Sequence, residues 1–460
     1  MLALDDTIAA ISTPIGEGGI GIVRLSGPDS KAILQRVFLP AGKRPRRPHD
    51  SAFESHRFYY GHVVDQDAMI LVDEVLAVLM CAPRTYTRQD VAEIHCHGGI
   101  VPLRRTLGLV LRCGARLAQP GEFTLRAFLN GRIDLAQAEA VLDVVRAKTD
   151  ISLRIAMQQL DGRISERVRK IRSSLVDALA YVEASLDFPE DEIPPLDLAS
   201  VLEVARDHIE ALLTQADQGL VYRQGVRTAI TGRPNVGKSS LLNALLRTSR
   251  AIVTPIPGTT RDTLEETLNL RGVPLCLVDT AGITNSADFI GRLGIERSRR
   301  ALQQADLILL IIDGSEPLWE EDFEIADLVR NRSAIVVVNK LDLVAVADDR
   351  AILAEVPHVH LSALTGEGLN LLEDAIVETI FSGQVQTSDV PVISNPRHSE
   401  ILRRALAQVT AAQSIHRDQG AADLVAIDLT AAVSALGEIT GETVSEDVLE
   451  AIFSSFCIGK

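Results

Sequence analysis

The sequence has few cysteines and no long apolar run. Its cysteines form no C-x-x-C pair and number only five: Cys81, Cys96, Cys113, Cys276 and Cys457. An odd, dispersed set argues against a disulfide framework or a structural zinc site and suits a reducing compartment. No apolar run approaches the roughly 18 residues that a membrane-spanning helix needs. We therefore expect a cytoplasmic protein that does not cross a membrane.

The chain also lacks an excess of positive charge. Its formal net charge is −16, which disfavours non-specific binding to nucleic acid. The acidic start at Asp5 and Asp6 predicts no signal peptide. Residues 1–120 nevertheless carry 14 basic and 12 acidic side chains, including a basic, Pro-rich cluster at residues 43–47. A solvated loop is the favoured interpretation of this cluster, but a locally basic face would still allow one specific RNA partner.

The length and the hydrophobic periodicity indicate several domains. A chain of 460 residues has room for about two to four cores, and it shows no internal repeat. Residues 1–120 alternate short strands with helices, which is typical of an α+β domain. Helical spacing from Ala127 to Val145, from Ile164 to Leu186 and from Leu202 to Leu213 predicts long helices. A capping box at residues 443–446 predicts the start of a further helix.

One short cluster, His95-Cys96-His97, invites a metal-site interpretation. On a strand, Cys96 faces away from both histidines, and no second group of ligands follows. We therefore interpret both histidines as structural.

The strongest motif is the octet Gly232-Arg-Pro-Asn-Val-Gly-Lys-Ser239, which matches G-x-x-x-x-G-K-[ST]. An apolar run at residues 226–230 precedes it and a helical pattern follows. A strand, a glycine-bearing loop and a helix start form a cradle in which backbone N–H groups face phosphate oxygens. In such a cradle Lys238 reaches the β- and γ-phosphates, and the Ser239 hydroxyl binds Mg²⁺.

Three further motifs follow at the ends of expected strands. Asp279-Thr-Ala-Gly282 is suited to hold Mg²⁺ through water and to meet the γ-phosphate. Asn339-Lys-Leu-Asp342 supplies a carboxylate that accepts both N–H donors of guanine, and the backbone at Ser362-Ala363 can contact the guanine carbonyl oxygen. Adenine lacks these donors, so the carboxylate selects strongly for guanine. Four motifs in this order on a parallel sheet predict a GTP-binding domain.

The GTP-binding segment interrupts a helical pattern that resumes after it, so we predict a multidomain α/β and α+β fold with an inserted domain. The predicted domains are an α+β domain, the first part of a helical domain, the inserted GTP-binding domain and the second part of the helical domain: residues 1–120, 121–220, 221–381 and 382–460.

The motif for hydrolysis is incomplete. Ile283 follows Asp-Thr-Ala-Gly, where Ras-like proteins carry a glutamine that orients the attacking water. Positive charge near the β–γ bridge is worth roughly 10³–10⁵ in rate. A monovalent cation held by Asn235 and by carbonyls of the loop Thr254–Asp262 is one source, with Thr260 completing the Mg²⁺ ligands. Asn235 is equally compatible with a purely structural role in its loop.

Motifs at both ends of the chain resemble one family. They are Gly18–Ser26, Pro120–Thr124, Arg126–Asn130, Asp134–Ala140 and the terminal Phe456-Cys-Ile-Gly-Lys460. Together with an inserted GTP-binding domain, they resemble the tRNA modification GTPase family MnmE, also called TrmE, over essentially the whole chain. The resemblance implies an N-terminal folate-binding domain that forms a homodimer, a helical domain and a Ras-like G domain.

The resemblance also implies an activity. Members of the family act in a heterotetramer with the FAD protein MnmG and add an aminomethyl or carboxymethylaminomethyl group to C5 of the wobble uridine of tRNA. A tetrahydrofolate derivative, in a 5-formyl or methylene form, supplies the one-carbon unit. K⁺ and GTP bring two G domains together for hydrolysis.

Carried over residue by residue, the resemblance implies three sets of ligands. The folate contacts are Arg24, Glu93, Arg132 and Lys460. The K⁺ ligands are Asn235, Thr254, Ile256 and Thr259, and Mg²⁺ lies at Ser239 and Thr260. The expected GTP site consists of Asn235, Val236, Gly237, Lys238, Ser239, Ser240, Thr254, Pro255, Ile256, Pro257, Gly258, Thr259, Thr260, Asp279, Thr280, Ala281, Gly282, Asn339, Lys340, Leu341, Asp342, Ser362, Ala363 and Leu364.

Two positions bear on catalysis. Cys457 lies beside the implied folate site, and we favour a thiol that acts as nucleophile or proton relay over a small buried residue that only packs. Members of the family carry a glutamate just before the run Arg292–Glu296, where it is thought to position the attacking water. Here that position is Gly291, so Asp288 is the candidate substitute. We expect hydrolysis to be slower or to use a different acid.

Two other functions fit the GTP-binding motifs. A ribosome-assembly GTPase like Era or Der predicts an RNA-binding appendage such as a KH domain, which the acidic helical flank and the Cys-Ile-Gly-Lys end do not match. A switch whose GTP state only recruits partners predicts that folate does not bind.

Overall fold

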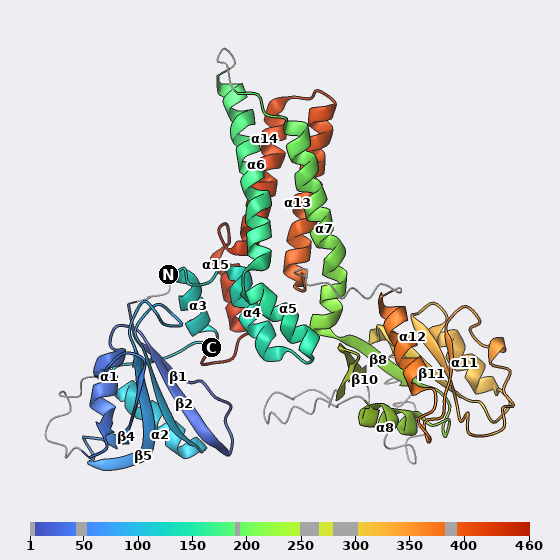
Figure 1. The fold of residues 1–460 in the computed structure, drawn as a ribbon, viewed down its shortest axis with the longest axis horizontal. Coiled ribbons are helices and arrows are strands. Elements are labelled where there is room, and N and C mark those ends of the chain that lie inside the picture. Colours follow the sequence, from blue (N-terminus) through green and yellow to red (C-terminus); the bar gives the residue numbers. More distant parts are fainter. Residues whose placement is uncertain (1–4, 43–52, 189–193, 249–265, 279–301, 382–392) are drawn as a thin grey trace. The chain divides into compact units, whose positions relative to one another are not determined.

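The computed structural model describes residues 5–42, 53–188, 194–248, 266–278, 302–381 and 393–460 (Figure 1). The chain forms two compact units. The first contains Met1–Leu142, Leu160–Arg169 and Ser434–Lys460, and the second contains Asp143–Gln159 and Lys170–Val433. None of the helices within the described ranges is long and apolar enough to span a membrane.

The first unit contains a seven-stranded sheet with the strand order β3-β4-β5-β6-β2-β1-β7. Neighbouring strands run antiparallel, except that β1 and β7 are parallel. The strands are β1 (Ile8–Ile11), β2 (Gly18–Ser26), β3 (Phe38–Pro40), β4 (Arg57–Asp65), β5 (Ile70–Met80), β6 (Val91–Gly98) and β7 (Arg116–Leu117). Successive side chains of a strand point to opposite faces of the sheet. In β2, Val23 and Leu25 are therefore fully buried, while Arg24 between them is not.

Two helices, α1 (Ser30–Val37) and α2 (Ile100–Arg112), cover one face of this sheet and complete its apolar core. Gly21 of β2 allows α2 to approach closely, because a Cβ at this position would lie 2.5 Å from Cδ1 of Leu103. The α+β architecture predicted for this segment is therefore confirmed.

The helical part of the chain consists of α3 (Glu122–Leu129), α4 (Leu135–Arg146), α5 (Asp150–Leu160), α6 (Arg163–Asp187), α7 (Leu198–Gln224), α13 (Pro396–Arg417), α14 (Ala422–Thr440) and α15 (Glu446–Ser454). In the second unit α7 and α13 lie side by side, although the inserted domain separates them in sequence (Figure 1). In the first unit, aromatic side chains of α15 and the C-terminal segment pack with α3.

Two helix boundaries differ from the sequence-based expectation. The stretch from Ala127 to Val145 is not one helix, because the chain turns at Gly131, whose φ is 68°. Helix α7 extends past Leu213 to Gln224, since buried Ala216 continues its apolar stripe.

The capping box expected at residues 443–446 is also wrong. The N-cap of α15 is Ser445, and its side chain makes no capping hydrogen bond. The Thr443 hydroxyl instead donates to the carbonyl of Ser434 at 2.6 Å.

The inserted domain is a six-stranded sheet in the order β13-β12-β11-β8-β10-β9. All neighbouring strands are parallel except the hairpin of β9 and β10. The elements are β8 (Val226–Thr231), α8 (Lys238–Thr248), β9 (Glu266–Leu270), β10 (Val273–Val278), β11 (Leu307–Asp313), α11 (Glu320–Val329), β12 (Ala334–Asn339), a 3₁₀ turn (Asp349–Ala351), β13 (His358–His360) and α12 (Leu369–Phe381).

Helices cover both faces of this sheet. One apolar cluster joins the strands to α8 and α12, and a second joins them to α11. Every residue of β11 and β12 is buried, as expected of central strands in a doubly wound fold. The predicted Ras-like domain inserted into a helical domain is thus confirmed, and the carboxyl ends of its parallel strands share one edge, where ligands bind in such folds.

Candidate functional sites

The phosphate loop joins β8 to α8 through glycines that no other residue replaces easily. Gly232 and Gly237 have φ values of 144° and 103°. A Cβ would lie 2.3 Å from the Ile311 carbonyl oxygen at the first position and 2.1 Å from Asn339 Nδ2 at the second. Asn235 also adopts a left-handed conformation, with φ 66°. The result is a tight turn that places backbone N–H groups ahead of the helix N-terminus.

The side chain of Lys238 folds back over this loop. Its Nζ donates to the carbonyls of Gly232 at 2.8 Å and Arg233 at 2.6 Å. Burial lowers the pKa of Lys238. Neither carbonyl carries a negative charge that would stabilise the ammonium. A phosphate beside Lys238 would supply such a charge and would therefore raise the pKa of Lys238. Arg233 is itself held by the buried carboxylate of Asp322 at 2.8 Å and lies over the Trp319 ring.

Asn339 connects the phosphate loop to the loop expected to contact guanine. Its Nδ2 donates to the Val236 carbonyl at 2.8 Å, and its Oδ1 accepts from the backbone N–H of Ala363 at 2.9 Å. The side chain is 3% exposed. One amide therefore joins the carboxyl ends of β8, β12 and β13.

The remaining guanine-site residues lie at the same edge. Asp342 is exposed and accepts from the Ser362 hydroxyl at 2.5 Å. Lys340, with φ 70°, pairs with Asp313 at the end of β11. Burial raises the pKa of Asp313, but hydrogen bonds from Lys340 and Ser315 outweigh it and the pKa is lowered. Asp313 was not among the predicted residues, although its place at the end of a fully apolar run marks it as a strand end.

Some of the other positions predicted for the nucleotide site are described by the structure, and the rest are not. Ser239 and Ser240 lie in the first turn of α8, while Leu341 and Leu364 are exposed beside the guanine-site loops. The following predicted positions lie outside the described residues: Thr254, Pro255, Ile256, Pro257, Gly258, Thr259, Thr260, Asp279, Thr280, Ala281, Gly282, Asp288 and Gly291.

In the first unit, Arg24 and Glu93 face each other across β2 and β6. Arg24 Nε donates to Glu93 Oε1 at 2.8 Å, and His95 Nε2 lies 3.0 Å from Glu93 Oε2. Burial raises the pKa of Glu93, but the contacts with His95 and Arg24 outweigh it, so the pKa is lowered. His95 is thus part of this constellation rather than remote from it.

The C-terminal segment returns to the same pair. Arg24 Nη1 donates to the carbonyl of Gly459 at 3.4 Å. Gly459 has φ 93°, and a Cβ there would lie 2.5 Å from the Ile11 carbonyl oxygen. Burial lowers the pKa of Lys460, Cys457 opposes this shift, and Arg24 adds to it. Cys457 is exposed, so the interpretation of this residue as a small buried packing group is wrong.

Arg132 contacts Tyr86 rather than Glu93. Its guanidinium lies 4.7 Å from the centre of the Tyr86 ring and donates to the Tyr86 carbonyl at 3.3 Å. Burial raises the pKa of Tyr86, while Arg132 and Arg24 both act to lower it. Tyr86 therefore lies against one of the predicted cations, Arg132, and no periodicity in the sequence marks it.

The remaining members of the histidine cluster separate as strand alternation predicts. Cys96 is buried, its thiol contacts Thr106, and burial raises its pKa to about 11. His97 Nδ1 lies 2.7 Å from Asp73 Oδ1 on the surface. Over the described ranges, no group of three or more His, Cys, Asp or Glu side chains is placed to hold a metal ion.

Comparison with known proteins identifies the family. The model of the GTP-binding protein TrmE N-terminus matches residues 7–132, and that of the MnmE helical domain matches residues 135–457. The tRNA modification GTPase MnmE of Chloroflexus aurantiacus is 52% identical over 99% of this chain and 100% of its own length. The chain belongs to the MnmE family. The MnmE proteins of Roseiflexus castenholzii (51% identical, 99% of each chain) and Bacillus subtilis (49%, 99% of this chain and 100% of that one) agree with this assignment.

Solved structures match part of the chain. The G domain of the FeoB iron transporter of T. maritima is 27% identical over 34% of this chain and 98% of its own, with a TM-score of 0.25. Era from Aquifex aeolicus, bound to GDP and AlF4⁻, is 28% identical over 42% of this chain and 67% of its own, with a TM-score of 0.26. The MnmE family resemblance drawn from the end motifs is thus confirmed by the family models and the full-length relatives.

Proposed function

We propose that this chain is a GTP-hydrolysing tRNA modification enzyme. With the FAD protein MnmG, in a heterotetramer, it adds an aminomethyl or carboxymethylaminomethyl group to C5 of the wobble uridine in the cytoplasm. The observation that supports this most directly is the amide of Asn339, which joins a phosphate loop to a guanine-site loop in a chain whose full-length relatives are named tRNA modification GTPases.

The nucleotide site fits GTP with Mg²⁺. The two glycines let the loop turn tightly against Ile311 and Asn339, Lys238 folds back over the loop, and Asp342 is exposed for the N–H donors of guanine. Ser239 and Thr260 would hold Mg²⁺, which neutralises charge on the β- and γ-phosphates when bound.

A potassium ion is proposed at the same loop. The left-handed conformation of Asn235 turns the loop sharply at the residue proposed to ligate K⁺. Together with Thr254, Ile256 and Thr259, it would hold an ion that supplies positive charge opposite the bridging oxygen. Gly291 stands where the family carries a glutamate, and Asp288 is the proposed substitute for that glutamate.

The constellation in the first unit fits a tetrahydrofolate derivative. Glu93, ionised and held by Arg24, can accept from N–H donors on the edge of a pterin ring. Arg132 and Lys460 supply cations that suit the glutamate tail. Folate provides the one-carbon unit when bound. Cys457, exposed and near Lys460, is the proposed nucleophile or proton relay in the uridine chemistry.

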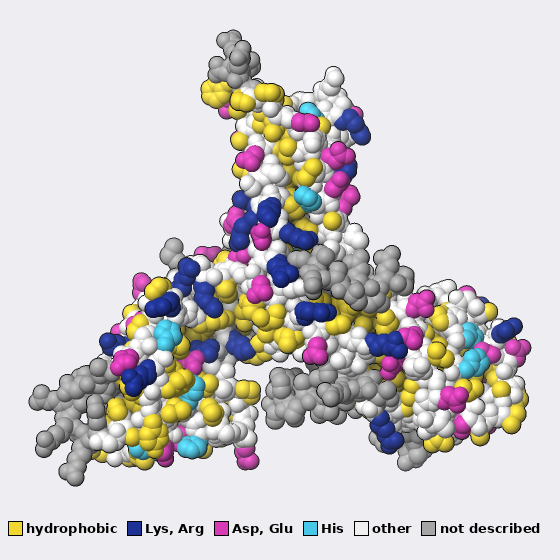
Figure 2. All heavy atoms as spheres, in the orientation of Figure 1, with side chains coloured by type: hydrophobic (Ala, Val, Ile, Leu, Met, Phe, Trp, Pro, Cys, Tyr) yellow, Lys and Arg dark blue, Asp and Glu magenta, His cyan; other side chains and the backbone are white. Residues whose placement is uncertain are grey.

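The sheet of the first unit offers a surface for a second copy of the chain. Its face opposite α1 and α2 carries Phe58 and Tyr60, each 54% exposed, and Leu76, 43% exposed. Figure 2 shows hydrophobic side chains on the surface of this unit. Contiguous exposed apolar groups of this kind mark association surfaces, and we propose that this surface forms the homodimer.

The test is reconstitution with MnmG, GTP, K⁺, a methylene- or formyltetrahydrofolate and unmodified tRNA, followed by mass spectrometry of the nucleosides. The expected product is 5-aminomethyl- or 5-carboxymethylaminomethyluridine at the wobble position, formed by the wild type and lost in Arg24→Ala. Failure of the purified chain to bind tetrahydrofolate, with GTP turnover intact, would instead support a switch that only recruits partners.

A further inference from the structure

One lysine of the helical part contacts both strands of a hairpin in the G domain. Lys148 lies in the connection between α4 and α5, within the second unit. Its Nζ donates to Thr267 Oγ1 on β9 at 3.3 Å and to Cys276 Sγ on β10 at 3.5 Å. Thr267 and Cys276 are buried and directly paired across the hairpin. A single ammonium therefore bridges the two strands where they pair.

The turn of this hairpin rests on the same helical connection. Gly272 has φ 92°, and a Cβ there would lie 2.2 Å from Cδ1 of Ile151, at the start of α5. The left-handed backbone favours glycine at this position, and a larger residue would have to displace the side chain of Ile151. Lys148 and Ile151 thus hold the hairpin at its middle and at its turn.

The hairpin lies in sequence between two segments that are proposed to contact the nucleotide. Strand β9 begins at Glu266, six residues after Thr260, and β10 ends at Val278, immediately before Asp279. The hairpin is therefore the covalent link between the two segments proposed to meet Mg²⁺ and the γ-phosphate. Since a paired hairpin moves as one body, a shift along its length displaces the ends of both segments together.

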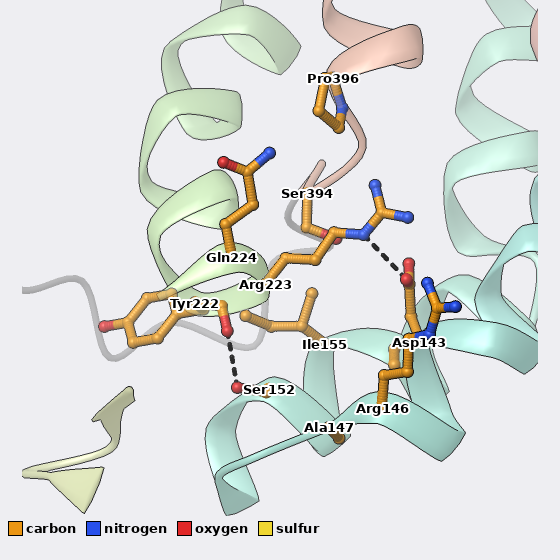
Figure 3. Close-up of a pocket in the computed structure, with 11 residues that line it drawn as sticks. Asp143, Arg146, Ala147, Ser152, Ile155, Tyr222, Arg223, Gln224, Ser394 and Pro396 are labelled. Carbon is orange, nitrogen blue, oxygen red and sulfur yellow. Dashed lines mark hydrogen bonds and ion pairs between the residues drawn. The ribbon is translucent and has the colours of Figure 1, made fainter. Parts of the chain in front are cut away.

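The end of α7 meets the same connection. Ser152 Oγ donates to the carbonyl of Tyr222 at 2.7 Å, and Arg223 Nε lies 2.8 Å from Asp143 Oδ1 (Figure 3). Gly225, where α7 ends and β8 follows, would place a Cβ 2.9 Å from the thiol of Cys276. The junction between α7 and β8, where the G domain begins, therefore lies beside the contact between Lys148 and the hairpin.

A cavity lies next to these contacts. It has a volume of about 360 Å³, and its lining includes Asp143, Arg146, Ser152, Tyr222, Arg223 and Ser394 (Figure 3). Protein interiors are otherwise close-packed, so shifts of packed elements need free volume beside them. The polar lining suits water, which can fill or leave such a space as side chains repack.

We propose that Lys148 is a positioning residue for GTP hydrolysis: it sets the placement of the β9–β10 hairpin, from which the chain continues in sequence into Thr260 on one side and Asp279 on the other, both proposed as nucleotide contacts. This inference rests on the proposed GTPase function. Because GDP has no γ-phosphate, its binding depends less on the hairpin than the binding of GTP does. Loss of the Lys148 contacts should therefore weaken a GTP analogue more than GDP.

The experiment compares two variants with a matched control in the full-length protein. Lys148→Met removes the donor and keeps the apolar stem, and Thr267→Val removes one acceptor at equal size. Lys31→Met, on the exposed side of α1, is the control. We expect the ratio of Kd values for a non-hydrolysable GTP analogue and GDP to rise about two- to thirtyfold in both variants. We expect kcat for GTP to fall in both.

Four outcomes bear on this inference and on the proposed function beneath it. A double variant whose ratio equals that of either single variant would support it, because the two residues then act through one contact. An unchanged or higher preference for the GTP analogue, with only a lower melting temperature, would overturn it and leave Lys148 structural. If Lys148→Met does not fold, Thr267→Val decides alone. A wild type that neither binds nor hydrolyses GTP would overturn the proposed function itself.

Discussion

Substitution of Asn339 by alanine should separate the architecture of the nucleotide site from its base specificity. The amide of Asn339 joins two loops through Val236 and Ala363, and both contacts are made within the protein itself. Alanine removes both hydrogen bonds and leaves the buried Val236 carbonyl and the half-buried Ala363 N–H without their partner. The G domain should therefore lose stability before any ligand is added.

The magnitude follows from the burial of these groups. A polar group that loses its partner inside a protein costs about 1–3 kcal/mol, so two such groups cost about 2–6 kcal/mol of unfolding free energy. For a domain of this size each kcal/mol lowers the melting temperature by about 2–4 °C. Even the lower bound predicts that the nucleotide-free G domain of Asn339→Ala melts about 4 °C earlier than wild type.

The matched control is Asp342→Asn in the same motif. Asp342 is exposed and its amide replacement can still accept from the Ser362 hydroxyl, so the melting temperature without nucleotide should stay close to wild type. The amide would, however, present a donor toward the two guanine donors. Loss of two charge-assisted hydrogen bonds costs about 3–6 kcal/mol, a drop in GTP affinity of roughly a hundred- to ten-thousandfold.

Scanning calorimetry without nucleotide, followed by titration with fluorescent GDP, measures both quantities. An Asn339→Ala protein that melts with the wild type but binds GDP weakly would refute the architectural role, since Asn339 would then act only on the base. Equal destabilisation of both variants would show that the loops are held by Asp342 as much as by Asn339.

Three further predictions concern the other sites. Gly237→Ala should abolish nucleotide binding in equilibrium titrations, because its Cβ would lie 2.1 Å from Asn339 Nδ2 and because its φ is 103°. GTP turnover should be faster in KCl than in NaCl, and Asn235→Ala should remove the difference; equal rates in the wild type would contradict the proposed K⁺ site. The pKa of Glu93 is lowered below its ordinary 4.5, so its pairing with Arg24 should hold above about that pH and be lost as pH falls through the lowered pKa. Tetrahydrofolate affinity should follow the same curve, and in Glu93→Gln it should be weak at every pH.

Much of the nucleotide site could be predicted from sequence, because its chemistry is local. The octet ending at Ser239 contains the glycines, the lysine and the helix start in order, and periodicity of the flanking residues marks the strand and helix around it. Strand ends are marked in the same way, since apolar runs stop at Asn339 and before Ser362. The hydrogen bond from Asn339 to the Val236 carbonyl could not be predicted from the sequence, because it joins residues that are far apart in the chain.

Helix boundaries failed where tertiary contacts override local preference. The residues before α15 match a capping box, yet the Thr443 hydroxyl has a closer acceptor in Ser434, and the helix starts two residues later than the box implies. Likewise, Tyr86 contacts the predicted folate cation Arg132 only in the folded protein. Such residues carry no periodic signal, so only the fold reveals them.

The arrangement of the folate-site candidates explains why both ends of the chain carry distinctive motifs. Arg24 lies on β2, whereas the carbonyl that it contacts belongs to Gly459, at the other end of the sequence. Backbone conformation makes glycine necessary there, and the N–H of Gly121 donates to the carbonyl of Cys457 at 3.4 Å. In sequence, the whole second unit lies between these partners. The site therefore forms only when the last residues of the chain have returned to the first sheet, so it depends on the fold of the helical part.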